Sequence, residues 1–467
     1  MAFQAGSVQV SRMRTERDSM GEMQVPDTAL YGASTQRAVL NFPISGHRMP
    51  AAFISGLGLV KAACAGANGE LGRLPPKLAE AIERTAREIG GGGWADQFPV
   101  DVFQTGSGTS TNTNINEVIA RLADLLAPAL GPVHPNDHVN LGQSSNDIIP
   151  TALHVSLALA LHRELGPALT VLHEALSERS RAFAEVIKAG RTHLMDAVPV
   201  TMGQVFSGYA AQVAKSLARN DSAIAALREL AVGGTAVGTG LNTHPDFARR
   251  VCLRLSAETG ILFHEAANHF EAQGGRDGCA EVAGLLATTA GAMARIASDI
   301  RLLGSGPRNG LGELKVPAVQ PGSSIMPGKV NPVLCESVIQ IGHYVQGLTV
   351  AVQSAARDGQ LELNVNLPLQ AHALHEMIRC MSGAARQFAE SCVAGLEADT
   401  DRCRETVERS LMLVTALTPV IGYDAAASVA KEAHATGRTL REVVLARGLM
   451  EAASLDEALD PRRMLQP

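Results

Sequence analysis

One short segment in the last third of the chain gathers side chains that could bind an anion and move a proton. Residues 322–332 read Gly-Ser-Ser-Ile-Met-Pro-Gly-Lys-Val-Asn-Pro, which combines two hydroxyls, a fixed cation and an amide. Asn331 suits the cap of a helix and Pro332 its first position. Because a helix N-terminus presents unpaired N–H groups and a partial positive charge, it attracts carboxylate or phosphate, and Lys329 adds a full charge there. The segment therefore predicts a site for a small anion.

Simpler interpretations of this segment remain open. Asn331 and Pro332 could form only a helix start, and Lys329 could be only a solvated surface charge. A nucleotide-binding phosphate loop is disfavoured, because five residues rather than four separate Gly322 from Gly328. Val330 also stands where such a loop needs a serine or threonine to hold magnesium.

Three further polar clusters share the character of this segment. They are residues 105–112 (Thr-Gly-Ser-Gly-Thr-Ser-Thr-Asn), 143–147 (Gln-Ser-Ser-Asn-Asp) and 190–193 (Gly-Arg-Thr-His). Asn114 with Glu117, and Thr201 with Gln204, have the spacing of capping-box pairs at helix starts. Each cluster alone could be only a helix cap. Four clusters with more hydroxyls and amides than caps need predict a pocket of neutral donors and one cation, which suits a small dicarboxylate.

His193 is the candidate for acid/base chemistry, although a lone histidine is more often structural. Arg191 and Thr192 give it a polar setting, and Glu336, after Pro332, is a candidate orienting partner. Glu336 could instead only complement the dipole of its helix. His134 and His138 lie four apart, but the residues between them read as a turn, so we predict no metal site.

Helices must position these clusters, because the apolar pattern is helical. From 282 to 303, apolar residues recur alternately four and three positions apart, and 341–352 repeats that spacing. Runs at strand period are few, apart from short stretches such as 21–25. The uncharged run 337–356 lacks the polar face of a solvent-exposed helix, so we predict a homo-oligomer with a shared helical core.

Composition excludes several classes of function. Hydrophobic residues make up 46% and aromatic residues 3%, so the core must be built from small aliphatic side chains. The net charge of −6 argues against nucleic acid as a partner. Seven scattered cysteines indicate reduced, cytoplasmic thiols, and residues 1–14 lack a secretory signal. The run 337–356, the one stretch that could suggest a membrane span, is broken by glutamines and a histidine, so we predict no membrane association.

The chain resembles the class II fumarases of the fumarase and aspartase superfamily over nearly its whole length. The matching segments are residues 17–21, 35–37, 104–109, 134–137, 143–147, 190–193, 233–245 and 322–332. The last segment marks the superfamily. The segment 233–245, together with Ser107 and Ser145, favours fumarase over aspartase. Gly131 departs from the family, which often has arginine there.

The resemblance implies a mainly α fold of three domains with a long central helix bundle. We expect an N-terminal helical domain with short β elements at 1–138, the central bundle at 139–366 and a small helical domain at 367–467. It also implies a homotetramer whose active sites are each built from three subunits. The implied reaction is the reversible hydration of fumarate to L-malate in the tricarboxylic acid cycle, with no metal or organic cofactor.

The resemblance further implies a role for each candidate residue. Ser323 would be the catalytic base on a mobile loop, and His193 paired with Glu336 the second acid/base centre. The implied substrate contacts are Ser107, Gly108, Thr109, Ser144, Ser145, Asn146, Thr192, Ser324, Lys329, Val330 and Asn331, and the implied secondary anion site is His134, Pro135, Asn136 and Asp137.

Two other functions remain as alternatives. An aspartate ammonia-lyase needs the same stabilisation of a carbanion, but its pocket must accept an ammonium group. A non-catalytic relative could keep the fold as a structural or binding protein, although retention of every candidate reactive side chain disfavours this.

Overall fold

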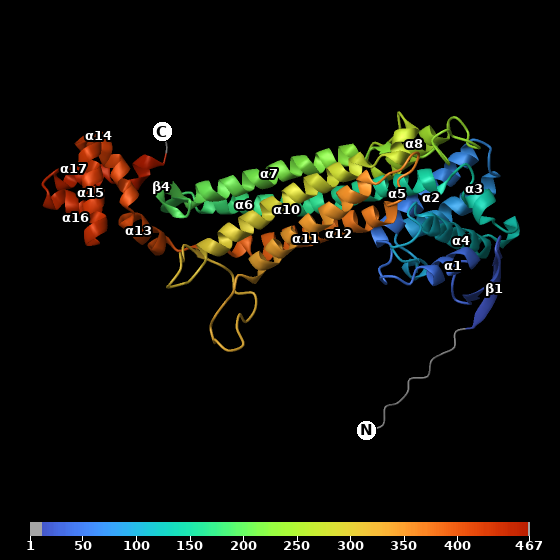
Figure 1. The fold of residues 1–467 in the computed structure, drawn as a ribbon, viewed down its shortest axis with the longest axis horizontal. Helices are drawn as coiled ribbons and strands as arrows, with labels where there is room; N and C mark the ends of the chain where they lie inside the picture. Colours follow the sequence, from blue (N-terminus) through green and yellow to red (C-terminus); the bar gives the residue numbers. More distant parts are fainter. Residues whose placement is uncertain (1–11, 466–467) are drawn as a thin grey trace, which may run out of the picture. The chain divides into compact units, whose positions relative to one another are not determined.

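The computed structural model describes residues 12–465, and the fold is mainly helical, as predicted (Figure 1). Residues 1–11, part of the segment without a predicted secretory signal, and residues 466–467 lie outside the described part. The chain forms two compact units. The first contains the chain up to Gly166, Arg219–Thr288 and Tyr344–Met381, and the second contains Pro167–Ala218, Thr289–His343 and the chain from Ser382 onward. The division into three domains stays a prediction.

Long helices supply residues to both units. They are α7 (Met202–Ala226), α10 (Asp277–Leu303), α11 (Val333–Arg357) and α12 (Leu367–Ser391). The seams predicted at 282–303 and 341–352 fall within α10 and α11, so the pattern of alternate four- and three-residue spacing identified both helices correctly.

The first unit begins with a strand hairpin and continues as packed helices. Its elements are β1 (Met13–Asp18), β2 (Gly21–Pro26), α1 (Ala33–Asn41), α2 (Ala51–Glu70), α3 (Pro76–Gly90), α4 (Thr109–Leu126), α5 (Ser145–Ala160), β5 (Glu229–Leu230), α8 (Phe247–Thr259), β6 (His264–Glu265) and α9 (His269–Gly274). β1 pairs antiparallel with β2, and β5 pairs parallel with β6. The predicted strand at 21–25 is therefore confirmed.

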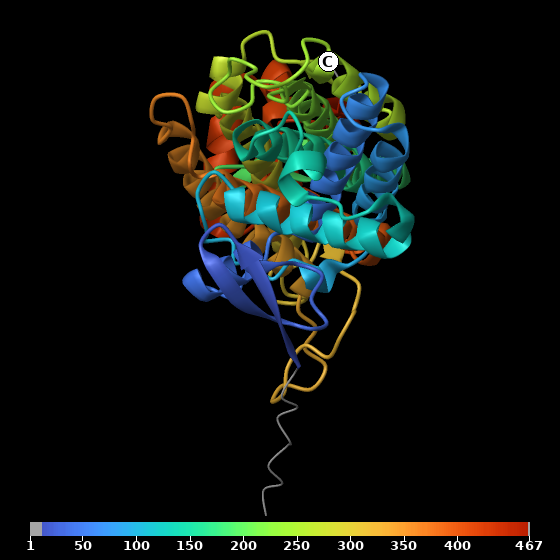
Figure 2. The same ribbon diagram turned by 90° about the vertical axis from the view of Figure 1, so that its right-hand side faces the viewer.

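Helix α2 is the centre of the first unit. It packs against α3, α5 and α8, and its Phe53, Leu57 and Val60 are fully buried. Figure 2 looks onto this unit, where the blue helices α2 and α3 lie side by side. Gly56 permits close packing, because a β-carbon there would lie 2.5 Å from that of Ser156 in α5. Small residues thus replace aromatic ones in forming a dense core.

The second unit contains a small C-terminal helical cluster and two strand pairs. Its elements are α6 (Gly166–Ala182, all but its first residue), β3 (Ile187–Thr192), β4 (Met195–Thr201), β7 (Leu314–Lys315), β8 (Glu397–Ala398), α13 (Thr400–Arg409), α14 (Thr418–Ile421), α15 (Tyr423–Thr436), α16 (Leu440–Ala446) and α17 (Ala452–Ala458). β3 pairs antiparallel with β4, and β7 with β8. Leu417, Val429, Val443 and Leu455 are among the buried residues that hold the C-terminal helices together.

Two helical runs in the described residues are long and apolar enough to cross a membrane, judged by length and composition. They are α2 and the continuous run Ser145–Ala182, and the segment 337–356 is not among them. Choosing 337–356 as the one such stretch was therefore wrong. Most of the apolar window of each run is buried inside the fold, as in core helices of folded proteins, and Lys61 lies within α2.

Two details of the predicted helix starts are also corrected. α11 begins at Val333, and the amide of Asn331 makes side-chain contacts within its own loop, so Asn331 does not cap the helix. Asn114 and Glu117 lie inside α4, where Glu117 accepts hydrogen bonds from Gly32 and Thr35. The Thr201 and Gln204 pair does form reciprocal hydrogen bonds of 2.9 Å at the start of α7.

Candidate active site

In the first unit, the starts of two helices meet through their hydroxyl groups. Thr109 is the first residue of α4 and Ser145 is the first residue of α5. The Thr109 hydroxyl lies 2.8 Å from that of Ser107 and 2.7 Å from that of Ser145. Gly108, which precedes α4, has a φ of 73°, a conformation that favours glycine. Two positive helix ends and three hydroxyls therefore face one place, an arrangement suited to a carboxylate.

Ser144 and Asn146 complete this part of the site. The Ser144 hydroxyl accepts the N–H of Asn146 at 3.2 Å, and Asp147 accepts the N–H of Ser144 at 2.9 Å, which closes a capping box. The Asn146 amide donates to the carbonyl of Ala236 at 2.8 Å. The predicted cluster at 143–147 is thus a helix cap that contains more hydroxyl and amide groups than capping requires.

Asp147 fixes this helix start to the loop at 233–236. Its fully buried carboxylate accepts the N–H groups of Gly233 and Thr235, each at 3.0 Å. Burial raises the pKa of Asp147 to about 6, although these N–H donors oppose the shift. Asp147 belongs to the predicted cluster at 143–147, although no role was predicted for it. Its role in the structure is to position Ser144, Ser145 and Asn146.

A buried lysine that the sequence analysis missed lies beside the same helix start. Lys61 donates 2.9 Å hydrogen bonds to the side-chain oxygens of Asn140 and Gln143. Asn112 and Asn116 also donate to the Asn140 oxygen, at 3.2 and 3.3 Å. Burial lowers the pKa of Lys61 to about 8. A lysine inside an Ala- and Gly-rich helix was the available signal, because such a position rarely holds an unpartnered charge.

The candidate secondary anion site consists of His134 and the π-helical turn that follows it, Pro135–Val139, in which Asn136 and Asp137 are exposed. The ring Nδ1 of His134 accepts the N–H groups of Asn136 and Asp137 at 3.3 and 3.0 Å. Two backbone donors that could hold an anion are thus engaged within the turn. Anion binding there stays a prediction.

In the second unit, His193 lies at the tip of the β3–β4 hairpin. This hairpin was not predicted, because the sequence lacks the Asn-Gly or Gly-rich pair that usually marks one. His193 and Leu194 form its two-residue turn with φ values of 55° and 63°, which are unusual for residues other than glycine. Thr192, His193 and Leu194 are exposed, so the turn offers its side chains outward.

The loop at 322–331 folds back on itself. The Asn331 amide donates to the carbonyl of Gly322 at 2.5 Å, and Lys329 Nζ donates to the Asn331 side-chain oxygen at 2.7 Å. A β-carbon at Gly322 would collide with the Lys329 carbonyl, so the closure requires glycine. Ser324, Lys329 and Val330 are exposed. The loop is a compact structure that presents its polar groups to solvent.

Ser323 has two donors aimed at its hydroxyl oxygen. The N–H groups of Ile325 and Met326 lie 3.3 and 3.0 Å from Ser323 Oγ. Two N–H groups on one oxygen favour negative charge there, which an alkoxide base requires.

Glu336 lies in the first turn of α11, as predicted. Within residues 12–465 its carboxylate forms no hydrogen bond or ion pair with His193. Both residues belong to the second unit, and this pairing is not seen within the one chain. The pairing of His193 with Glu336 stays a prediction. A cavity of about 840 Å³ opens beside the hairpin and is lined by Arg191, Thr192 and Arg295, among others.

The structure thus gathers the candidate residues in two sets. Ser107, Thr109, Ser144, Ser145 and Asn146 are linked around two helix starts in the first unit. Lys329 and Asn331 are joined in the loop of the second unit, and His193 stands on its own hairpin.

Comparisons with known proteins cover almost all of the chain. Residues 21–347 match a family described as lyase, and residues 413–466 match one described as the fumarase C C-terminus. The chain is 50% identical to fumarate hydratase class II 2 of Bradyrhizobium diazoefficiens, over 97% of each chain. It is 49% identical to mitochondrial fumarate hydratase of Rattus norvegicus, over 97% of this chain and 90% of that protein. The crystal structure of a class II fumarase from Schistosoma mansoni superposes with a TM-score of 0.94 at 40% identity, covering 97% of this chain and 99% of that one.

Proposed function

The chain belongs to the class II fumarate hydratase family of lyases, and we propose that it interconverts fumarate and L-malate by general acid/base catalysis through a carbanion intermediate. The observation that supports this reaction is a sequence identity of 49% to 50% with fumarate hydratases over 97% of this chain. The residue roles rest on the chemistry of the two sets of side chains described above.

In the direction of malate dehydration, Ser323 is the base that removes a proton from the carbon beside the C4 carboxylate. The electron pair left behind spreads onto that carboxylate and gives it a second negative charge. The carbanion then expels the neighbouring hydroxyl as water, with a proton delivered by His193. Hydration of fumarate is the reverse. Each step of dehydration transfers a proton or breaks the carbon–oxygen bond. Malate is thereby converted to fumarate and one water molecule.

The doubly negative carboxylate sets the main electrostatic demand. Lys329, the amide of Asn331 and the N–H groups of the loop are the donors that we assign to it. Losing one such preorganised donor costs on the order of 3 kcal/mol in transition-state stabilisation. The hydroxyls of Ser107, Thr109 and Ser145 and the amide of Asn146 bind the other carboxylate, with Ser144, Thr192 and Ser324 as further contacts.

We further propose that the active site is completed only in a homotetramer, with His193 of one subunit meeting both Glu336 and the base Ser323 of a neighbouring subunit. In support, among residues 12–465 the Glu336 carboxylate forms no hydrogen bond or ion pair with His193 of the same chain, and the His193 turn is exposed. The tetramer, the secondary anion site and the absence of a metal or organic cofactor are the expectations that the family resemblance implies. The cytoplasmic location is the expectation from the pattern of cysteines.

Ultraviolet absorbance tests the reaction, because fumarate has a conjugated double bond that malate and aspartate lack. Purified protein should raise the absorbance when given L-malate and lower it when given fumarate. Absorbance that rises with L-aspartate and not with L-malate would establish an ammonia-lyase instead. No change with any dicarboxylate would indicate a non-catalytic relative.

A further inference from the structure

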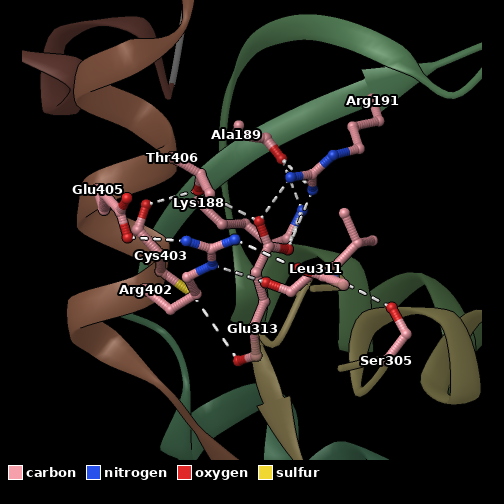
Figure 3. Close-up of polar contacts among 11 residues, drawn as sticks. Lys188, Ala189, Arg191, Ser305, Leu311, Glu313, Arg402, Cys403, Glu405 and Thr406 are labelled. Atoms are coloured by element: carbon pink, nitrogen blue, oxygen red, sulfur yellow. Dashed lines mark hydrogen bonds and ion pairs between the residues drawn. The ribbon is translucent and has the colours of Figure 1, made fainter. Parts of the chain in front are cut away.

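A buried ion cluster in the second unit binds strand β3 of the hairpin that carries His193 (Figure 3). The Glu313 side chain is fully buried. Arg191 donates to both of its carboxylate oxygens, at 2.8 and 3.0 Å, and Lys188 Nζ lies 3.2 Å from one of them. Both cations come from β3, and Arg191 lies two residues before His193. Glu313 was not predicted as a site residue, since a single acidic residue in a loop has no recognisable pattern.

Glu313 also joins the hairpin to the surrounding segments. Its N–H donates to the carbonyl of Leu303 at the end of α10, and its carbonyl accepts the N–H of Asp399 before α13, at 2.9 and 3.0 Å. Thr406 of α13 donates to the carboxylate at 3.3 Å. One residue therefore fixes β3 to the end of α10 and to both the cap and the body of α13.

A bulge in the hairpin lets both cations of β3 reach Glu313. Lys188 and Arg191 lie three apart, which would place them on opposite faces of a regular strand. The pairing register shifts between Ala189 and Arg191, where two residues of β4 stand opposite Gly190, and such a bulge increases the local twist. Both cations can therefore reach one carboxylate.

The hairpin tip is paired through its backbone, but its side chains are exposed. Thr192, His193, Leu194 and Met195 are exposed, and the Leu194 side chain is 76% exposed. The turn has positive φ at two residues without glycine, a conformation that persists only when neighbouring structure imposes it. The two-point contact between Arg191 and the buried Glu313 is the side-chain ion pair of β3 that lies nearest to the turn.

From these contacts we infer that Glu313 is a positioning residue for the proposed hydration reaction, acting through Arg191 to fix the direction in which His193 is presented. This inference rests on the proposed function. Glu313 touches no reacting atom in this account. Its contribution is the placement of the acid/base group, and misplacement by about 1 Å can cost about a hundredfold in rate.

The variant Arg191→Lys tests the inference, because it keeps every charge but replaces the planar two-point contact with a single point charge. We expect kcat to fall about tenfold or more, with KM changed less than about threefold, because an acid/base group acts in the transition state. Glu313→Gln should show the same pattern. If Glu313→Gln does not fold, because two buried cations are then uncompensated, Arg191→Lys alone decides the question.

A double-mutant cycle with His193→Asn separates positioning from general loosening. If Glu313 and Arg191 act through His193, Arg191→Lys changes the residual kcat of His193→Asn by less than about twofold. Losses that multiply in the double variant would overturn the inference.

Arg402→Gln is the matched control, because Arg402 anchors the same loop through the carbonyls of Gly310 and Leu311 without touching Glu313. It should lower the melting temperature and leave kcat near the wild-type value. An equal loss of kcat in Arg402→Gln would also overturn the inference. These outcomes are distinct from failure of the proposed function, which would appear as no fumarate hydration by the wild-type protein.

Discussion

Lys329 and Asn331 form a 2.7 Å hydrogen bond at the end of the loop at 322–331, with the lysine ammonium exposed to solvent. The cation is therefore held close to the amide that we assign to the same substrate carboxylate. A preorganised pair of this kind stabilises charge that develops during the reaction.

Lys329→Ala should therefore raise KM and lower kcat, with kcat/KM reduced about a hundredfold or more. Steady-state kinetics with L-malate would measure both constants. Lys315→Ala is the control, because Lys315 is an exposed lysine whose surface ion pair with Asp399 contributes little. A change in kcat with unaltered KM would mean that Lys329 does not bind the ground state.

Ser323→Ala should lower kcat by about a hundredfold to ten-thousandfold, the range for a placed proton-transfer group, with a modest change in KM. The two N–H groups that donate to Ser323 Oγ remain in the variant, so the loss reports the base itself. The neighbouring Ser324→Ala gives a comparison that keeps this base. Near-normal turnover in Ser323→Ala would refute its assignment.

Lys61→Met should change how stability depends on pH. The folded pKa of Lys61 is lowered from 10.5 to about 8 by burial, so between these values the unfolded state binds more protons than the folded state. The stability of the wild-type protein relative to Lys61→Met should thus rise by about 3 kcal/mol as pH rises from 8 to 10.5, and be lost as pH falls through 8. Urea unfolding at fixed protein concentration would measure the difference.

The exposed Lys77 supplies the control for this experiment, since Lys77→Met removes a lysine from the surface of α3. Its unfolding free energy should follow the wild-type pH dependence. Parallel curves of unfolding free energy against pH for Lys61→Met and the wild-type protein would contradict the assignment of a buried, destabilised ammonium.

Sequence pattern was informative where one element determines the structure. The seam at 282–303 predicted α10 because apolar spacing alone decides which face of a helix is buried. The cap formed by Thr201 and Gln204 was predicted because capping is local. The hairpin at His193 was missed because its turn uses residues that do not favour positive φ. Lys61 and Glu313 were missed because their partners are distant in sequence and only the folded chain brings them together.

The shared active site is the central claim, and mixing two inactive variants tests it most directly. His193→Asn and Ser323→Ala each lack one acid/base group, so neither homotetramer should turn over malate at an appreciable rate. If His193 and Ser323 of one site come from different subunits, random mixed tetramers should contain intact sites and recover about a quarter of wild-type activity.

The double variant, which carries both substitutions in one chain, provides the control when it is mixed with His193→Asn, since no intact site can form. Refolded mixtures of the two single variants, assayed by the absorbance of fumarate, should show activity well above both parents and above this control. Activity no higher than that of the parents would contradict the proposal that one site takes His193 and Ser323 from different subunits.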